Sequence, residues 1–273
     1  MHIKIMNKEV CEKCKRKSCA RNDFVSKSDF YNLKSEKNTC PIKIISNGPS
    51  KEQLLNGYID IPEMEGQIGC LNCGLCVKCC SKSNLKNEEE IKIDLSTIKS
   101  QNKIQANNIA NVIATSYLNN LFDFSANTNL NKNLRFDGYV SLSDDEGCFV
   151  ETDIKDDSLE CCRRLLGDFI SYNSIHPTTK IDQGLVVLEN LPKKGSHDIY
   201  TLVEKIRKFP KTAGFKIYFT TLPILQFFFT KFSKNQHSFL ELFYLMTEED
   251  KEHYIKRLIE NNIISKCDMK LFD

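Results

Sequence analysis

The spacing of apolar residues separates a second part of the chain, with regular helix and strand patterns, from a cysteine-rich first part. Apolar side chains recur every three or four residues over 103–122 and 199–209, and this periodicity predicts two helices that each bury one face. Apolar runs bounded by turn residues predict strands at 136–142 and 148–154, joined as a hairpin by the turn 143–147. The other predicted elements are a helix over 159–170, strands at 184–188 and 215–220, and helices after residue 222, the last capped by Thr247 and Asp250 and ending near Asn262.

The order of these elements indicates the fold class. In the second part, strands alternate with helices, which is typical of a partly parallel sheet covered by helices. In the first part, short strands are predicted at 42–45 and 58–62. The polar stretch 81–90 contains three consecutive glutamates and is interpreted as a solvated linker or the start of a helix, with the domain boundary at its end. We therefore predict an α+β chain of two domains, a small module over 1–90 followed by an α/β domain with a mixed sheet over 91–273.

The candidate chemistry of the first part lies in its cysteines, most of all in the run GCLNCGLCVKCC. This run contains Cys70, Cys73, Cys76, Cys79 and Cys80. Four of them, with Cys80 as the last, have the spacing Cys-x2-Cys-x2-Cys-x3-Cys, which is the ligand run of bacterial ferredoxins. Gly74 gives the loop the backbone freedom that lets N–H groups bond to cluster sulfurs. Five thiols in eleven residues favour an iron–sulfur cluster over the alternative metal, zinc. Cys79 is the alternative fourth ligand.

An earlier set of cysteines extends this pattern. It consists of Cys11, Cys14, Cys19 and Cys40, with Pro41 directly after the last. With both sets present, residues 1–80 resemble the two-cluster bacterial [4Fe–4S] ferredoxins, which implies a ferredoxin-like iron–sulfur module. The resemblance implies one cluster on Cys11, Cys14, Cys19 and Cys80, and another on Cys40, Cys70, Cys73 and Cys76. The earlier set is spaced more widely than is usual in that family, so zinc binding and loss of the metal remain open for it.

Charge and composition change the picture in two ways. The formal net charge is +2, but residues 1–51 carry 12 Lys and Arg against 5 Asp and Glu, a net of +7. Such a segment could offset an anionic cluster or meet an acidic partner or phosphates. We find neither a signal-peptide pattern nor a run of about 18 apolar residues. The thirteen cysteines are therefore interpreted as metal ligands and ordinary thiols in a reducing cytoplasm, and no membrane association is expected.

Three acidic residues form the candidate site of the second part: Asp137, Glu151 and Asp153. The predicted hairpin brings Asp137 towards Glu151, and Glu151 and Asp153 share a strand face because side chains alternate with period two. Carboxylate oxygens are suited to Mg²⁺ or Mn²⁺. The alternative is an acidic hairpin whose side chains are solvated or pair with lysines. Arg163 and Arg164, in the following helix, could contact phosphate, but the simpler expectation is that they point to solvent.

Over roughly residues 103–190, this order of elements and acids resembles the core of the PD-(D/E)XK nucleases. The resemblance implies that Asp137 is the metal-binding aspartate and Glu151 the acidic residue of the next motif. The lysine that this family carries two residues later is absent, and Asp153 stands in its place.

Two function hypotheses follow from these patterns. The first is an iron–sulfur protein with two [4Fe–4S] clusters that acts in electron transfer or redox sensing with a partner protein. The second is a metal-dependent nuclease or nucleic-acid-binding protein in which the clusters have a structural or regulatory role. Structural clusters in an interaction protein are a third option that the sequence leaves open.

Overall fold

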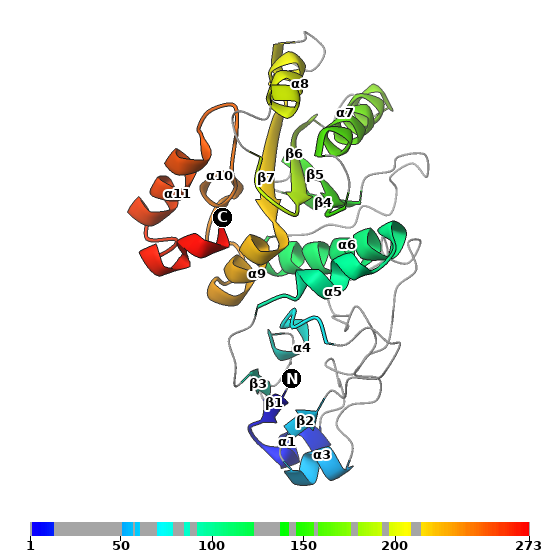
Figure 1. Cartoon of the computed structure of the whole chain (residues 1–273), viewed down its shortest axis with the longest axis vertical. Coiled ribbons are helices and arrows are strands. Elements are labelled where there is room, and N and C mark those ends of the chain that lie inside the picture. Colours follow the sequence, from blue (N-terminus) through cyan, green and yellow to red (C-terminus); the bar gives the residue numbers. More distant parts are fainter. Residues whose placement is uncertain are drawn as a thin grey trace. The chain divides into compact units, whose positions relative to one another are not determined.

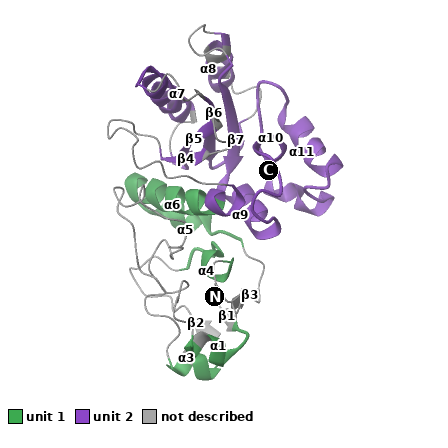
Figure 2. Ribbon diagram, turned by 180° about the vertical axis from the view of Figure 1, so that it is seen from behind, with its two compact units in different colours: residues 1–117 green, residues 118–273 purple. Residues whose placement is uncertain are grey.

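The computed structural model divides into two compact units, unit 1 over residues 1–117 and unit 2 over residues 118–273 (Figure 2). The predicted boundary at 90/91 falls outside the described residues and stays a prediction. The structure describes residues 2–13, 51–56, 58–60, 70–78, 85–87, 92–122, 137–141, 146–155, 158–175, 180–192, 197–208 and 214–272.

Unit 1 contains a small antiparallel sheet and several helices (Figure 1). The sheet has the order β2-β1-β3, formed by Tyr58–Asp60, His2–Ile5 and Leu85–Asn87. Its outer strand β3 pairs with β1 from Ile3↔Asn87 to Ile5↔Leu85. The linker interpretation of 81–90 is therefore wrong at Leu85–Asn87, and β1 was not predicted. The helices are α1 Lys8–Glu12, α3 Lys51–Asn56, α4 Leu75–Lys78, α5 Leu95–Ser100 and α6 Lys103–Leu121, whose last residues belong to unit 2.

Unit 2 is built on a mixed four-stranded sheet of the order β4-β5-β6-β7. β4 is antiparallel to β5, whereas β5, β6 and β7 run parallel and are connected through the helices α7 and α8. This mixed sheet confirms the α+β class, and the predicted strands and helices of this region are all present. Their bounds are β4 Gly138–Ser141, β5 Glu146–Asp153, α7 Ser158–Ile175, β6 Lys180–Leu188, α8 His197–Lys208 and β7 Lys216–Thr221.

Helix α7 packs closely over β5 and β6 because β6 carries a glycine beneath it. A Cβ added to Gly184 would overlap with Leu165 Cδ2 of α7 and would lie 3.1 Å from Phe215 Cζ. Gly184 is paired with Phe149 of β5, whose ring makes an edge contact with Tyr172 of α7 at 5.3 Å. The face of β5 that carries residues 149, 151 and 153 is therefore the face that α7 covers.

The residues after β7 form a helical layer with an aromatic core. Its elements are α9 Leu222–Lys231, α10 Phe239–Leu242, α11 Lys251–Glu260 and the 3₁₀ helix η3 Lys266–Leu271. The rings of Phe239 and Phe243 are 4.5 Å apart, and Tyr218 of β7 meets Phe239 edge-on at 5.3 Å. The prediction of helix throughout is wrong at Tyr244, which pairs with Phe219 as an isolated β-bridge. Of the two predicted cap residues, Asp250 is confirmed, because it is the N-cap of α11 and accepts a hydrogen bond from His253 N at 2.8 Å.

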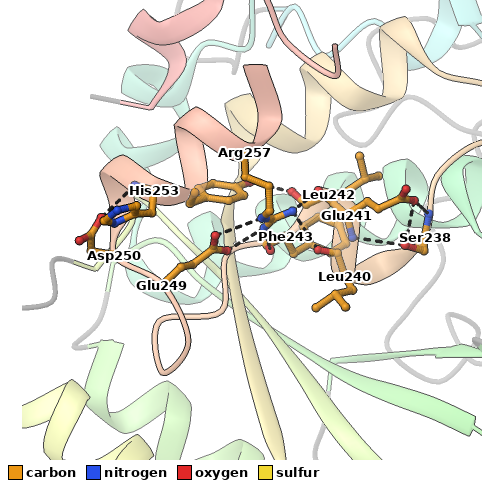
Figure 3. Close-up of polar contacts among 10 residues, drawn as sticks. Ser238, Leu240, Glu241, Leu242, Phe243, Glu249, Asp250, His253 and Arg257 are labelled. Carbon is orange, nitrogen blue, oxygen red and sulfur yellow. Dashed lines mark hydrogen bonds and ion pairs between the residues drawn. The ribbon is translucent and has the colours of Figure 1, made fainter. Parts of the chain in front are cut away.

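One arginine ties α10 and α11 together (Figure 3). The guanidinium of Arg257 forms two contacts with the carboxylate of Glu249, at 2.7 and 3.0 Å. It also donates to three backbone carbonyls at the end of α10, those of Leu240, Glu241 and Phe243, at 2.7–3.1 Å. Carbonyls at a helix C-terminus have no partner within the helix. Arg257 therefore satisfies groups that would otherwise depend on solvent.

Within the described part of the chain, no helix combines the length and the apolar character needed to cross a membrane.

We predict that Arg257→Met lowers the free energy of unfolding by about 2 kcal/mol, because it leaves Glu249 and three carbonyls without their donor. Urea unfolding followed by circular dichroism measures the change. Lys256→Met is the matched control, because Lys256 pairs only across the surface with Glu260, at 3.7 Å with side chains 69% and 64% exposed. Its effect should stay within about 0.5 kcal/mol. Equal, small effects of the two substitutions would show that the arginine network does not stabilise unit 2.

Candidate functional site

The loop that carries Cys70, Cys73 and Cys76 has a backbone conformation that turns an N–H group towards a cysteine sulfur. Two of its residues have positive φ, Asn72 at 50° and Gly74 at 73°. This conformation turns the N–H of Asn72 towards Cys70 Sγ, at a distance of 3.4 Å. The short helix α4 then begins at Leu75 and carries Cys76. The positive φ at Gly74 agrees with the backbone freedom predicted for that position.

Three hydrogen bonds hold this cysteine loop in unit 1. The carbonyl of Leu71 accepts from Asp94 N at 2.9 Å, and the side chain of Asn72 donates to Lys92 O at 2.9 Å. The third bond runs from Tyr117 Oη to the carbonyl of Cys73 at 2.7 Å. Cys73 is 9% exposed, whereas Cys70 and Cys76 are half-buried. The loop is thus fixed at its backbone, and its outer cysteines are within reach of solvent.

The remaining predicted ligands cannot be located in the same way. Cys11 lies in α1, but its side chain is outside the described residues. The cysteines Cys14, Cys19, Cys40, Cys79 and Cys80 also lie outside the described residues. Among the residues that the structure describes, no three His, Cys, Asp or Glu side chains are grouped so that they could hold a metal ion. The assignment of eight cysteine ligands therefore stays a prediction.

In unit 2, the structure brings Asp137 and Glu151 together. Asp137 N donates to Val150 O at 3.1 Å and extends the β4–β5 ladder by one residue. Its Oδ2 accepts from Thr152 N at 3.0 Å, so its carboxylate is held beside β5. Gly138 of β4 pairs with Val150 of β5, so the same register, continued by one residue, places Asp137 opposite Glu151. Two acids 14 positions apart in the sequence thus form one pair.

Asp153 lies on the same face but has different partners. Its Oδ2 is 3.0 Å from Arg164 Nη2, and its Oδ1 accepts from Lys155 N at 3.1 Å. The same Nη2 lies 3.7 Å from Glu151 Oε2. Both acidic side chains are almost fully buried, at 3% and 0% exposure, whereas that of Arg164 is 38% exposed. Glu151 and Asp153 therefore share the predicted strand face, and Arg164 bridges them.

Burial sets the protonation of this cluster. It raises the pKa of Glu151 well above its usual range, and the nearby carboxylate of Asp137 raises it further. Arg164 opposes this rise, and Asp168 of α7 adds to it. For Arg164 itself, burial lowers the pKa, but the attraction of Glu151 and the hydrogen bond to Asp153 outweigh burial and raise it. One cation thus stands among four carboxyl groups.

The donor atoms of the pair fit a proton or a divalent cation. Glu151 Oε1 is buried and, among the described residues, has no hydrogen-bond partner. A buried oxygen in this state is costly unless a cation or a proton reaches it. Mg²⁺ is commonly bound through one or two carboxylates, with waters and substrate phosphates as its other ligands. Asp137 and Glu151 could supply that pair, whereas Asp153 is committed to Arg164.

Two residues of this cluster were missed by sequence reasoning. Arg164 was expected to point to solvent, and this is wrong because it pairs with two buried acids. Asp168, four residues later on α7, was not considered. The helical spacing of these two residues could have placed them on one face. Only the packing of α7 against β5 shows that this face meets the acids. Arg163, in contrast, is 60% exposed and pairs with Glu160.

We predict that Glu151→Gln makes the folded protein more stable than wild type at pH 7 in the presence of a chelator. Below about pH 4.5, where an ordinary glutamate titrates, Glu151 is protonated in both states and makes no pH-dependent difference. As the pH rises, the unfolded chain releases this proton before folded Glu151 does, because the folded pKa is raised, so the free energy of unfolding of wild type falls relative to the variant. Urea unfolding from pH 4 to 8 measures this divergence.

The matched control for this titration is Glu160→Gln. Glu160 belongs to α7, the helix that covers Glu151, but its side chain is 54% exposed. Its difference from wild type should not grow in the same pH window. A Glu151→Gln difference that is constant across the range, or that shrinks as the pH rises, would contradict the raised pKa.

Comparisons with known proteins attach no family to either site. No family model, curated protein sequence or solved structure matches the chain. The function of both sites has to be inferred from their own residues and contacts.

Proposed function

We propose that this chain is an iron–sulfur protein whose cysteine loop holds a [4Fe–4S] cluster and acts in electron transfer or redox sensing. The observation that carries the proposal is the N–H of Asn72, which points at Cys70 Sγ from a residue with positive φ. Anionic cluster sulfurs are stabilised by backbone N–H groups, and hydrogen bonds of this kind help to set reduction potentials. A cluster held here would accept or release one electron at a time.

The residues of the loop have distinct roles in this proposal. Cys70, Cys73 and Cys76 supply thiolates, and Cys73 lies deepest. Asn72 directs its backbone N–H at the sulfur of Cys70, and Gly74 gives the loop its backbone freedom. The fourth ligand comes from Cys40 by the crossover that ferredoxin-like spacing implies, and Cys80 then serves a second cluster with Cys11, Cys14 and Cys19. A partner protein would exchange electrons with the side of the loop where Cys70 and Cys76 are half-buried.

We predict that anaerobically purified or reconstituted protein absorbs broadly near ~400 nm and contains inorganic sulfide in proportion to iron. Replacing Cys70, Cys73 or Cys76 by Ser should abolish one cubane, measured as the loss of about four irons per chain. Cys148→Ser is the control, because Cys148 lies fully buried in β5 of unit 2, and it should leave the iron content unchanged. Bound zinc without sulfide would contradict the proposal.

The same measurement separates the possible ligand sets. Cys40→Ala should remove the cluster of Cys70, Cys73 and Cys76, whereas Cys80→Ala should remove the other cluster. Cys79→Ala should leave both in place. One cubane per chain would reduce the proposal to a single-cluster protein. If a cluster is lost in Cys79→Ala but kept in Cys80→Ala, the ligand is Cys79 and not Cys80.

The paired carboxyl groups of unit 2 favour a second candidate function, metal-dependent cleavage of nucleic acid. Two observations support it. Asp137 and Glu151 interact with each other, and Glu151 Oε1 is buried and has no hydrogen-bond partner among the described residues. A divalent ion bound there would polarise a phosphate oxygen and activate water. Asp137 and Glu151 would hold that ion. Arg164, fixed by Asp153, would keep a positive charge beside Glu151 and limit the repulsion among the acids.

We predict that the full chain cleaves DNA or RNA only with Mg²⁺ or Mn²⁺ added, and that Asp137→Asn or Glu151→Gln lowers the rate at least about 100-fold while the fold is retained. Gel assays on single- and double-stranded substrates at several salt concentrations test this, because phosphate contacts are salt-sensitive. Glu160→Gln should remain active. Binding without cleavage would indicate a nucleic-acid-binding protein, and neither binding nor cleavage would remove this candidate.

A further inference from the structure

The carbonyl of Cys73, in the cysteine loop, accepts a hydrogen bond from a tyrosine far along the chain. Tyr117 lies on α6 and is fully buried, and its hydroxyl donates to that carbonyl at 2.7 Å. The two residues are 44 positions apart, and both belong to unit 1. A buried tyrosine hydroxyl needs a partner, and a buried carbonyl that loses its donor is costly. This bond therefore constrains the middle cysteine of the loop.

The constraint reaches the next residue through the planarity of the peptide. In a trans peptide, the C=O and the following N–H point in opposite directions. The structure has no cis peptide bond among its described residues. When Tyr117 holds the carbonyl of Cys73, it also turns the N–H of Gly74 to the opposite side of the peptide. Positive φ at Gly74 then directs the chain into α4 and to Cys76.

We infer that Tyr117 is a positioning residue for the iron–sulfur site, and that its hydroxyl fixes the Cys73–Gly74 peptide so that Cys73 and Cys76 are presented together. This inference rests on the proposed iron–sulfur function. The hydroxyl also has an electrostatic effect, because its hydrogen points towards the loop. The positive end of that dipole favours the more negative, reduced form of a bound cluster. Tyr117 thus contributes both to retention of the cluster and to its reduction potential.

Tyr117→Phe tests this inference because it removes only the hydroxyl. Anaerobically reconstituted variant should lose iron to a chelator about fivefold faster than wild type, and its midpoint potential should shift to a more negative value. In the metal-free protein, iodoacetamide should alkylate Cys73 about fivefold faster, measured by peptide mass spectrometry. This last readout needs no cluster and reports directly on whether the loop is held.

Tyr254→Phe is the matched control. Tyr254 is also fully buried, and its hydroxyl also donates to a backbone carbonyl, Leu242 O, at 2.7 Å. This bond lies in unit 2, so its loss should lower stability without changing iron loss, potential or Cys73 alkylation. If Tyr117→Phe does not fold, 3-fluorotyrosine at position 117 replaces it. The more acidic hydroxyl is a stronger donor, and it should slow alkylation and shift the potential in the positive direction.

The outcomes separate this inference from the proposed function. A wild-type protein that binds no iron and sulfide would overturn the iron–sulfur proposal, and the positioning role with it. A cluster-bearing wild type whose Tyr117→Phe variant matches it in iron loss, potential and alkylation would overturn the inference alone. If Tyr117→Phe and Tyr254→Phe change iron loss, potential and alkylation equally, Tyr117 only stabilises the fold and does not position the loop.

Discussion

The close approach of α7 to the sheet determines the chemistry of unit 2. It depends on Gly184, where any side chain would collide with Leu165 of the helix. Arg164 precedes Leu165 on α7. The packing of Leu165 over Gly184 therefore also brings the guanidinium of Arg164 beside β5. The register of β5 with β6 sets Glu151 two residues beyond the partner of Gly184. The absence of a side chain at Gly184 of β6 therefore lets Arg164 of α7 reach the acids of β5.

Between α7 and β5, the carboxyl groups of this cluster outnumber its arginine. Arg164 is 3.0 Å from Asp153 and 3.7 Å from Glu151, and Asp137 and Asp168 stand nearby. Burying carboxylates is costly, and one arginine cannot neutralise all of them. Burial and the nearby carboxylate of Asp137 raise the pKa of Glu151, which favours its protonated form. Well-packed apolar residues in place of a buried ion pair are often no less stable, so this group of acids is not explained by stability alone.

The sequence predicted most elements of unit 2 because their apolar periodicity is set by the faces that the sheet and helices bury. It predicted that Asp137 approaches Glu151 because a hairpin places strand residues opposite each other. It did not predict Arg164 beside them, since the distance between a helix and a sheet depends on packing at Gly184. In unit 1, β1 and β3 have only four and three residues, which is too short for a reliable period. Their pairing is made by backbone hydrogen bonds, which leave little trace in the sequence.

The hydrogen bonds that hold the cysteine loop come from residues that the cysteine pattern does not mark. A ferredoxin-like cysteine spacing describes only the groups that face the metal. The groups that hold the loop face away from it, and they come from Lys92, Asp94 and Tyr117. A fragment ending at residue 90 would keep the cysteines of the run but lose all three of these hydrogen bonds. The smallest part of the chain that can present this loop as described therefore extends into α6.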